Sequence, residues 1–234
     1  SRTNGNSLAT YRNNKFIRNL NMKKMLIITG PQGAGNHMWA KIFSLHPEVF
    51  GWNTLLDNYW ESHRFGEPFA KEWKNVDLLD EFDWSKSDYY TTSISVPLGI
   101  PDDDLNPLYV PRLTNFSNKL KELGIEVQWA IVGRDQSILN HQQTRIRGES
   151  TVPLFMEQIN DLENPIFLSY EMVYLYKEHY VKSLDTIVPV KWDDERLSEI
   201  VAHDANAKYV HSIEHNELDK GNRFATVFKE NPNK

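Results

Sequence analysis

The chain has 234 residues, of which 40% are hydrophobic and 25% are charged, and its formal net charge is −6. This length and composition exclude a fibrous or wholly disordered protein and are sufficient to close the core of one globular domain. The lack of cysteine excludes disulfides, cysteine–zinc sites and thiol nucleophiles, and it fits a reducing compartment. No apolar run approaches the roughly 18 residues that a membrane-spanning helix needs. We therefore expect a cytoplasmic protein with no membrane partner.

The charge is unevenly distributed along the chain. Residues 1–24 contain six basic residues and no acidic one, so the rest of the chain is strongly acidic. Residues 1–21 are rich in asparagine and lack both the periodicity of regular structure and the apolar core of a signal peptide. We expect them to form a basic, disordered leader without catalytic function, and residues 22–234 to form a single domain. The acidic body disfavours nucleic acid as a partner.

Apolar runs alternate with helical patterns through the expected domain. Strands are expected at 25–29, 49–52, 89–96, 127–132, 165–169 and 186–190. Helices are expected at 36–45, over much of 54–82, at 113–123, after residue 135 and between the last two strands, whereas 97–111 is expected to be a loop. This alternation indicates an α/β fold of three layers, with a central parallel sheet and helices on both faces.

A glycine-rich segment follows the first expected strand. It places four residues between Gly30 and Gly35 and continues with two polar residues into a helix, which is the frame of a phosphate-binding loop, or P-loop. In such loops backbone N–H groups converge on an anion, and the helix N-terminus adds the positive end of its dipole. We expect Asn36 to cap the helix. The sequence thus predicts a P-loop-type domain whose anion lies on Gly33, Ala34, Gly35, Asn36 and His37; a glycine-rich turn that binds nothing is the alternative.

Two positions of this loop differ from those of nucleotide-hydrolysing proteins. Such proteins carry a lysine that reaches the outer phosphates, followed by a serine or threonine that holds magnesium. Here these positions are Asn36 and His37. We therefore expect an anion that is bound without a metal, and a divergent P-loop kinase is a secondary alternative.

Three segments in the same order resemble those of the sulfotransferases, especially the bacterial and tyrosylprotein types. The loop and Ser44–Val49 (Ser-Leu-His-Pro-Glu-Val) align without a gap with the family's glycine-rich loop and its His-Pro-Asp/Glu motif. Residues 130–135 (Ala-Ile-Val-Gly-Arg-Asp) resemble the strand and Arg-Asp pair that begin the family's 3′-phosphate-binding segment. Residues 167–171 (Phe-Leu-Ser-Tyr-Glu) resemble its late strand and the following Tyr-Glu pair.

The resemblance implies a metal-free transfer of a sulfuryl group from 3′-phosphoadenosine 5′-phosphosulfate (PAPS). The acceptor would be a hydroxyl or amine of a small molecule or glycan, and catalysis would come from positioning and electrostatic stabilisation. The loop would hold the 5′-phosphosulfate, and Arg134 would pair with the 3′-phosphate. The family's serine eight residues after this arginine is replaced by Gln142, which leaves Ser137 as the nearest hydroxyl and His141 as a neighbouring donor.

Two departures from the family concern catalysis. Gly33 stands where the family's loop carries an arginine or lysine, and the acidic base that often follows the family's second strand is replaced here by Trp52 and Asn53. His37 could replace either group, because an imidazole can act as a cation or as a base near neutral pH. We therefore expect His37, with Asp57 and Glu61 as the nearest carboxylates, to be the catalytic candidates. The alternative is a non-catalytic protein that binds a nucleotide or another anion in the same loop.

Overall fold

The computed structural model describes residues 22–52, 68–99 and 108–202. The expected leader, and the candidate catalytic carboxylates Asp57 and Glu61, lie outside these ranges. None of the described helices is both long enough and apolar enough to cross a bilayer.

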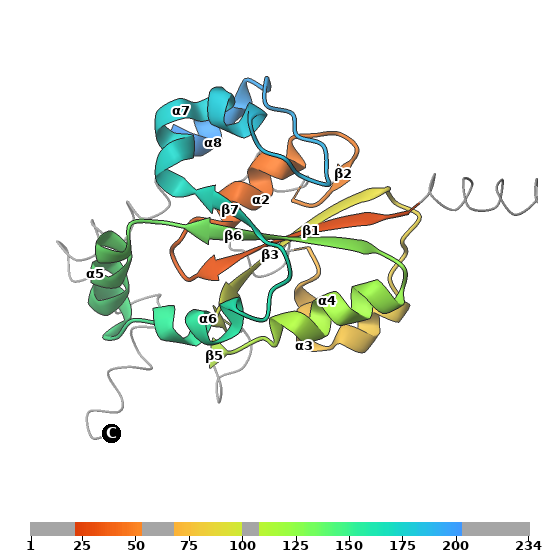
Figure 1. Ribbon diagram of the computed structural model, residues 1–234, viewed down its shortest axis with the longest axis horizontal. Helices are drawn as coiled ribbons and strands as arrows, with labels where there is room; N and C mark the ends of the chain where they lie inside the picture. Colours follow the sequence, from red (N-terminus) through yellow and green to blue (C-terminus); the bar gives the residue numbers. More distant parts are fainter. Residues whose placement is uncertain (1–21, 53–67, 100–107, 203–234) are drawn as a thin grey trace, which may run out of the picture.

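A sheet of five parallel strands forms the centre of the fold (Figure 1). The strands lie in the order β2-β3-β1-β6-β7, with bounds β1 Lys24–Pro31, β2 Val49–Phe50, β3 Tyr89–Val96, β6 Glu126–Gly133 and β7 Ile166–Ser169. β1 is central because its apolar run, which is fully buried, is covered on both faces of the sheet. The chain continues from β1 towards β3 on one side and later places β6 on the other, so β1 lies where the strand order reverses. Ligands of open α/β sheets bind at such points, beyond the carboxyl ends of the strands.

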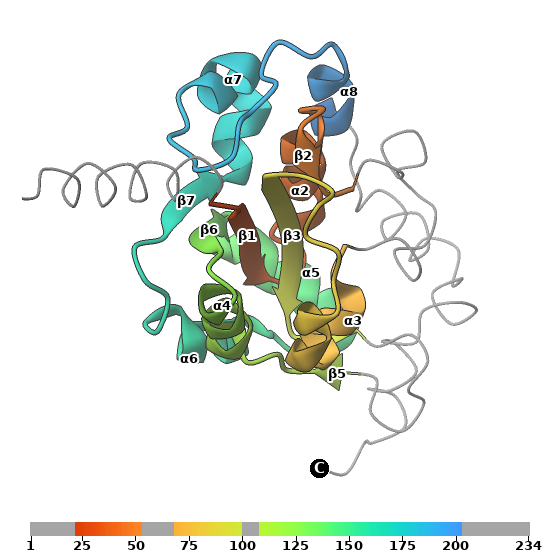
Figure 2. The same cartoon turned by 90° about the vertical axis from the view of Figure 1, so that its right-hand side faces the viewer.

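Helices cover both faces of the sheet (Figure 2). One face carries α2 (Asn36–Ser44), α7 (Tyr170–Lys182) and α8 (Arg196–Ala202), and the other carries α3 (Ala70–Lys74), the 3-10 helix η2 (Val76–Asp80), α4 (Leu113–Glu122) and α6 (Val152–Ile159). A separate apolar cluster fills each interface, around Trp39 and Phe43 on the first face and around Phe116 and Trp129 on the second. This arrangement confirms the three-layer α/β fold expected from the sequence.

The helix α5 (Gln136–Arg147) lies apart from these two layers, beyond the arrowheads of the strands (Figure 1). It begins directly after the Arg134-Asp135 pair that follows β6, and Asp135 caps it by accepting the N–H of Ile138 at 2.9 Å. The carboxyl end of the sheet is therefore bordered by α5 on one side and by the starts of α2 and α7 on the other.

Two expectations about strands were wrong. The stretch 97–111 contains a short antiparallel pair, β4 (Leu98–Gly99) with β5 (Leu108–Tyr109), and two-residue strands are too short to show an alternating pattern. Residues 186–190 do not form a strand. The N–H of Ile187 donates to the side chain of Gln128 on β6 at 2.9 Å, and the hydroxyl of Thr186 donates to the carbonyl of Val188 at 2.8 Å. The Gln128 side chain thus holds this segment beside β6, where a strand would have formed backbone hydrogen bonds.

Candidate functional site

Three segments that are far apart in the sequence meet at the carboxyl end of the sheet. Arg134, just after β6, donates from Nη1 to the carbonyl oxygen of Gly33 in the β1–α2 loop at 2.8 Å. Its guanidinium carbon lies 4.5 Å from the ring centre of Tyr170, the first residue of α7. The backbone N–H of Asp135 donates to Oε1 of Glu171 at 2.9 Å. The segments that meet here are the ones that resemble sulfotransferase segments.

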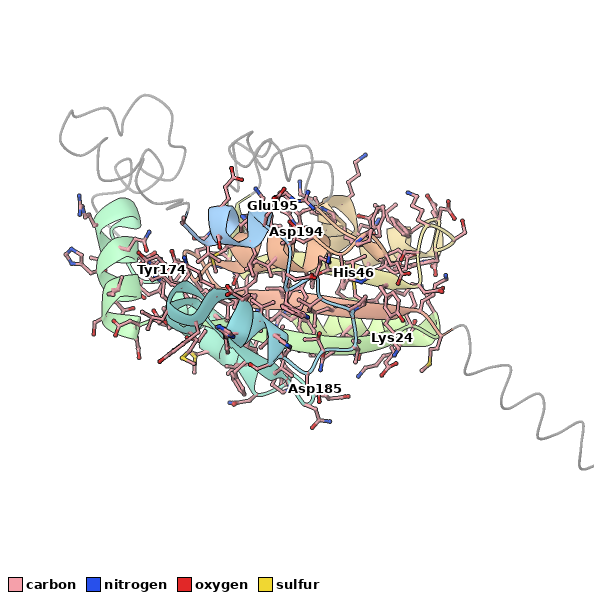
Figure 3. The ribbon with its side chains drawn as sticks, turned by 90° about the horizontal axis from the view of Figure 1, so that it is seen from above. Lys24, His46, Tyr174, Asp185, Asp194 and Glu195 are labelled. Atoms are coloured by element: carbon pink, nitrogen blue, oxygen red, sulfur yellow. The ribbon has the colours of Figure 1, made fainter. Side chains whose placement is uncertain are left out.

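Two residues labelled in Figure 3 mark the two ends of the sheet. Lys24, at the start of β1, lies at one end, and Tyr174, one turn into α7, lies towards the other, where the strands end. The candidate site is at this second end, because the β1–α2 loop, Arg134 and Tyr170 all follow the last residue of a strand.

The loop adopts a backbone conformation that glycine favours. Gly33 and Gly35 have φ angles of 84° and 106°, in the left-handed region that other residues rarely adopt. A Cβ on Gly30 would lie 2.8 Å from Oδ1 of Asn36 and 3.0 Å from the carbonyl oxygen of Val132. The glycines therefore allow both the turn and the close approach of α2 to the sheet.

Several loop N–H groups have no acceptor among the residues that the structure describes. Ala34 donates to the carbonyl of Pro31 at 3.2 Å, but the N–H groups of Gly33, Gly35 and Asn36 donate to nothing within the described ranges. Gly33 and Gly35 are partly exposed, and α2 starts at Asn36 without a side-chain cap. Unsatisfied N–H groups at a helix start are the elements of an anion site.

The expectation that Asn36 caps α2 was wrong, because the capping position is occupied by Gly35. The Asn36 side chain is buried and donates from Nδ2 to the carbonyl of Gly30 at 3.1 Å and to Oγ of Ser95 at 3.0 Å. It therefore ties the start of α2 to β1 and β3. As a result, the first N–H groups of the helix are not covered by a capping side chain.

Arg134 uses only part of its guanidinium in these contacts. Nη1 donates to Gly33 and to Oε1 of Gln142, the latter at 3.1 Å, whereas Nε and Nη2 form no hydrogen bond to any described residue. The Nε–Nη2 edge is one of the two-donor edges of arginine that bind phosphate or carboxylate with two parallel hydrogen bonds. Ser137 is exposed in the first turn of α5, and its side chain makes no hydrogen bond within the described part of the chain. The structure thus brings Gln142, but not Ser137, to Arg134.

Gln143 is a supporting residue that the sequence did not single out. It is fully buried, and its Nε2 donates to the carbonyl of Gln32 at 2.6 Å. Its Oε1 accepts the N–H of Thr151 at 2.8 Å and the hydroxyl of Ser150 at 3.2 Å. This side chain joins the β1–α2 loop to α5 and to the start of α6, and nothing in the pattern of a polar helix distinguishes it from its exposed neighbours.

His37, Lys41 and Trp52 form a second group at the start of α2. The ring centres of His37 and Trp52 are 5.1 Å apart at an angle of 51°, and Nζ of Lys41 lies 5.9 Å from the ring centre of Trp52. Lys41 is fully buried, and this burial lowers its pKa from 10.5 to about 8. Lys41 was missed in the sequence, although a lone lysine among Met38, Trp39 and Ile42 is a signal of a buried charge.

Metal ligands do not gather in the part of the chain that the structure describes: no three His, Asp or Glu side chains lie together as a metal ion would require. No family model matches the chain, and no curated protein sequence matches it significantly. The sulfotransferases therefore remain a resemblance, carried by the three segments that meet at this site.

Proposed function

We propose that the protein binds PAPS in the β1–α2 loop and transfers its sulfuryl group to a hydroxyl or amine of a small molecule or glycan. The observation that supports this proposal most is the meeting of Gly33, Arg134 and Tyr170, because these residues come from the three segments that resemble the family. The N–H groups of Gly33, Gly35 and Asn36 are suited to hold a tetrahedral anion without a metal.

The proposed reaction exchanges one sulfur–oxygen bond for another bond to sulfur. The acceptor oxygen or nitrogen attacks the sulfur, the bond between sulfur and the bridging phosphate oxygen breaks, and 3′-phosphoadenosine 5′-phosphate (PAP) leaves. The acceptor's proton must go to a base. Of the three candidate bases, only His37 lies within the described ranges, and it stands at the start of α2 beside the loop. The loop N–H groups would stabilise the charge that develops on the transferred group and on the leaving phosphate.

A second candidate function is non-catalytic binding of a nucleotide or another anion. It is favoured by the contacts of Arg134, whose Nη1 is engaged by the Gly33 carbonyl, and by the lack of a side chain at Gly33 itself. A single donor aimed at the developing charge is worth roughly 3–4 kcal/mol of transition-state stabilisation. A loop that lacks the family's cation would keep its affinity for the nucleotide more readily than its rate.

A divergent kinase receives less support from the geometry. The amide of Asn36, which stands in place of the kinase lysine, is engaged with Gly30 and Ser95. It is neutral, so it supplies no charge to the outer phosphates of a nucleotide.

The two leading candidates differ in turnover. We would incubate the protein with radiolabelled PAPS and panels of phenols, sugars and amines, with His37→Ala and His37→Gln as matched variants. Transfer of label that falls at least tenfold in both variants supports a sulfotransferase in which His37 takes part. If PAPS binds but no acceptor gains label, the binding protein is the better account. Equal transfer by all three proteins would remove His37 from the mechanism.

A further inference from the structure

Tyr170 contacts both the cation and the backbone of the candidate site. Its ring lies under the Arg134 guanidinium at 4.5 Å. The same ring is packed against the loop, since a Cβ on Gly35 would lie only 2.8 Å from its Cδ2. Tyr170 thus fills the space between Arg134 and Gly35, and the sequence did not indicate this arrangement.

The residues that flank Tyr170 are held in place by several hydrogen bonds. Oγ of Ser169 caps α7 by accepting the N–H of Met172 at 3.1 Å, and the N–H of Ser169 donates to the hydroxyl of Tyr180 at 3.0 Å. Tyr180 in turn packs edge-on against Trp39 of α2, with ring centres 5.9 Å apart. The start of α7 is therefore fixed relative to the helix that follows the loop.

Glu171 adds a second link to the same strand end. Its Oε1 accepts the N–H of Asp135, the residue next to Arg134, at 2.9 Å. Two residues of the Ser169–Glu171 segment therefore hold Arg134. Glu171 fixes the backbone next to Arg134, and Tyr170 fixes the plane of the guanidinium. A stacked guanidinium keeps its hydrogen-bonding edges available, because the ring contacts its face.

We propose that Tyr170 is a positioning residue of the anion site, which acts through Arg134 and need not touch the ligand itself. The inference rests on the proposed binding of a nucleotide at this loop. A free arginine side chain loses much rotational freedom when it binds an anion, and ordering it beforehand reduces that cost. Tyr170 orders Arg134 with its Nε–Nη2 edge unoccupied by the described residues, so the ring contributes to affinity by preorganisation.

A double-mutant cycle tests this role. The affinity for PAP would be measured by calorimetry at fixed ionic strength for the parent, Tyr170→Leu, Arg134→Ala and the combination of the two. We expect Tyr170→Leu to weaken PAP binding about 5- to 10-fold in the parent and less than twofold in the Arg134→Ala protein. Tyr170→Phe keeps the ring and should restore the parent affinity to within twofold.

Two further variants serve as controls. Tyr174 lies one turn later on α7 and its side chain is 58% exposed, so Tyr174→Leu should leave PAP affinity unchanged. Tyr170→Met, which fills space without a ring, replaces Tyr170→Leu if the leucine variant does not fold. An equal loss in both Arg134 backgrounds, or no loss in either, would overturn the positioning role while leaving the proposed function intact. If the parent binds no PAP, the proposed function fails, and the inference fails with it.

Discussion

Gly35 joins the loop to α2, and the Tyr170 ring at the start of α7 packs against it. Its φ angle of 106° makes it the left-handed residue that precedes α2, and the Tyr170 ring leaves no space for a Cβ. At the same position the N–H group is without an acceptor in the described ranges. A single residue thus combines the conformation, the packing and the free donor that the site requires.

Replacing Gly35 with alanine should therefore affect both stability and binding. We expect Gly35→Ala to cost about 2–4 kcal/mol of unfolding free energy, from backbone strain together with the clash with Tyr170, and to weaken anion binding. Gly124→Ala is the matched control, since Gly124 has a φ of 77° but an added Cβ there meets nothing within 4 Å. It should cost only about 1 kcal/mol in urea unfolding and leave binding unchanged. Equal losses in the two variants would contradict the packing argument.

Lys41 makes a separate prediction about pH. Its pKa is about 8 in the folded protein and 10.5 ordinarily, so between these values the unfolded chain binds more protons than the folded one. The free energy of unfolding should therefore rise with pH through this window, by about 1–3 kcal/mol, because the penalty for burying the charged form is lost. The measurement is urea unfolding from pH 7 to 10.5 for the parent and Lys41→Met.

The difference between these two proteins isolates Lys41 from the other groups that titrate in the same range. We expect Lys41→Met to be more stable relative to the parent at pH 7 than at pH 10.5. A difference in stability that is constant across the window would show that Lys41 does not titrate there.

Among the elements, α5 supports the loop through two neighbouring glutamine side chains. Gln142 reaches the loop through Arg134, and Gln143 binds the carbonyl of Gln32 directly. The polar character of this helix suits its position beyond the strand ends, because its side chains form hydrogen bonds with backbone groups there.

The loss of Gln143 should consequently be costly. In Gln143→Leu the carbonyl of Gln32 and the N–H of Thr151 both lose their partner, which predicts a destabilisation of about 2–4 kcal/mol. Gln136→Leu, at the exposed start of the same helix, is the control and should change stability by less than about 0.5 kcal/mol. Both would be measured by urea unfolding. A similar small effect in the two variants would mean that the loop does not depend on Gln143.

Elements with a strong local pattern were predictable from the sequence, and those that depend on single side chains were not. The run around Ile27 reads as a buried strand because both of its sides are apolar, and β1 has that character. By contrast, residues 186–190 have the composition of a strand, yet the backbone N–H of Ile187 donates to the side chain of Gln128 and not to the backbone of a neighbouring strand. The candidate site shows the same division: the loop was predictable from glycine spacing and Arg134 from resemblance, whereas Gln143 and the ring of Tyr170 depend on contacts between segments more than 25 residues apart.

At the scale of the whole molecule, the strand order accounts for the place of the site. β1 and β6 are neighbours in the sheet although the sequence between them includes β2 and β3, so the β1–α2 loop and Arg134 come to lie side by side. β7 pairs with β6 in parallel, so the start of α7 lies at the same carboxyl end of the sheet. The proposed binding site therefore depends on the order of the parallel strands as much as on any single motif.

We propose that the carboxyl end of the sheet binds a PAPS-type nucleotide without a metal. A thermal-shift comparison of PAP with ATP and magnesium, on the parent and on Arg134→Ala, tests it most directly, since a ligand that binds only the folded state raises the melting temperature. We predict that PAP raises the melting temperature of the parent, that ATP with magnesium has little effect, and that Arg134→Ala loses most of the PAP shift. A shift with ATP and magnesium but none with PAP, or a PAP shift that Arg134→Ala retains in full, would contradict metal-free binding of the nucleotide at Arg134.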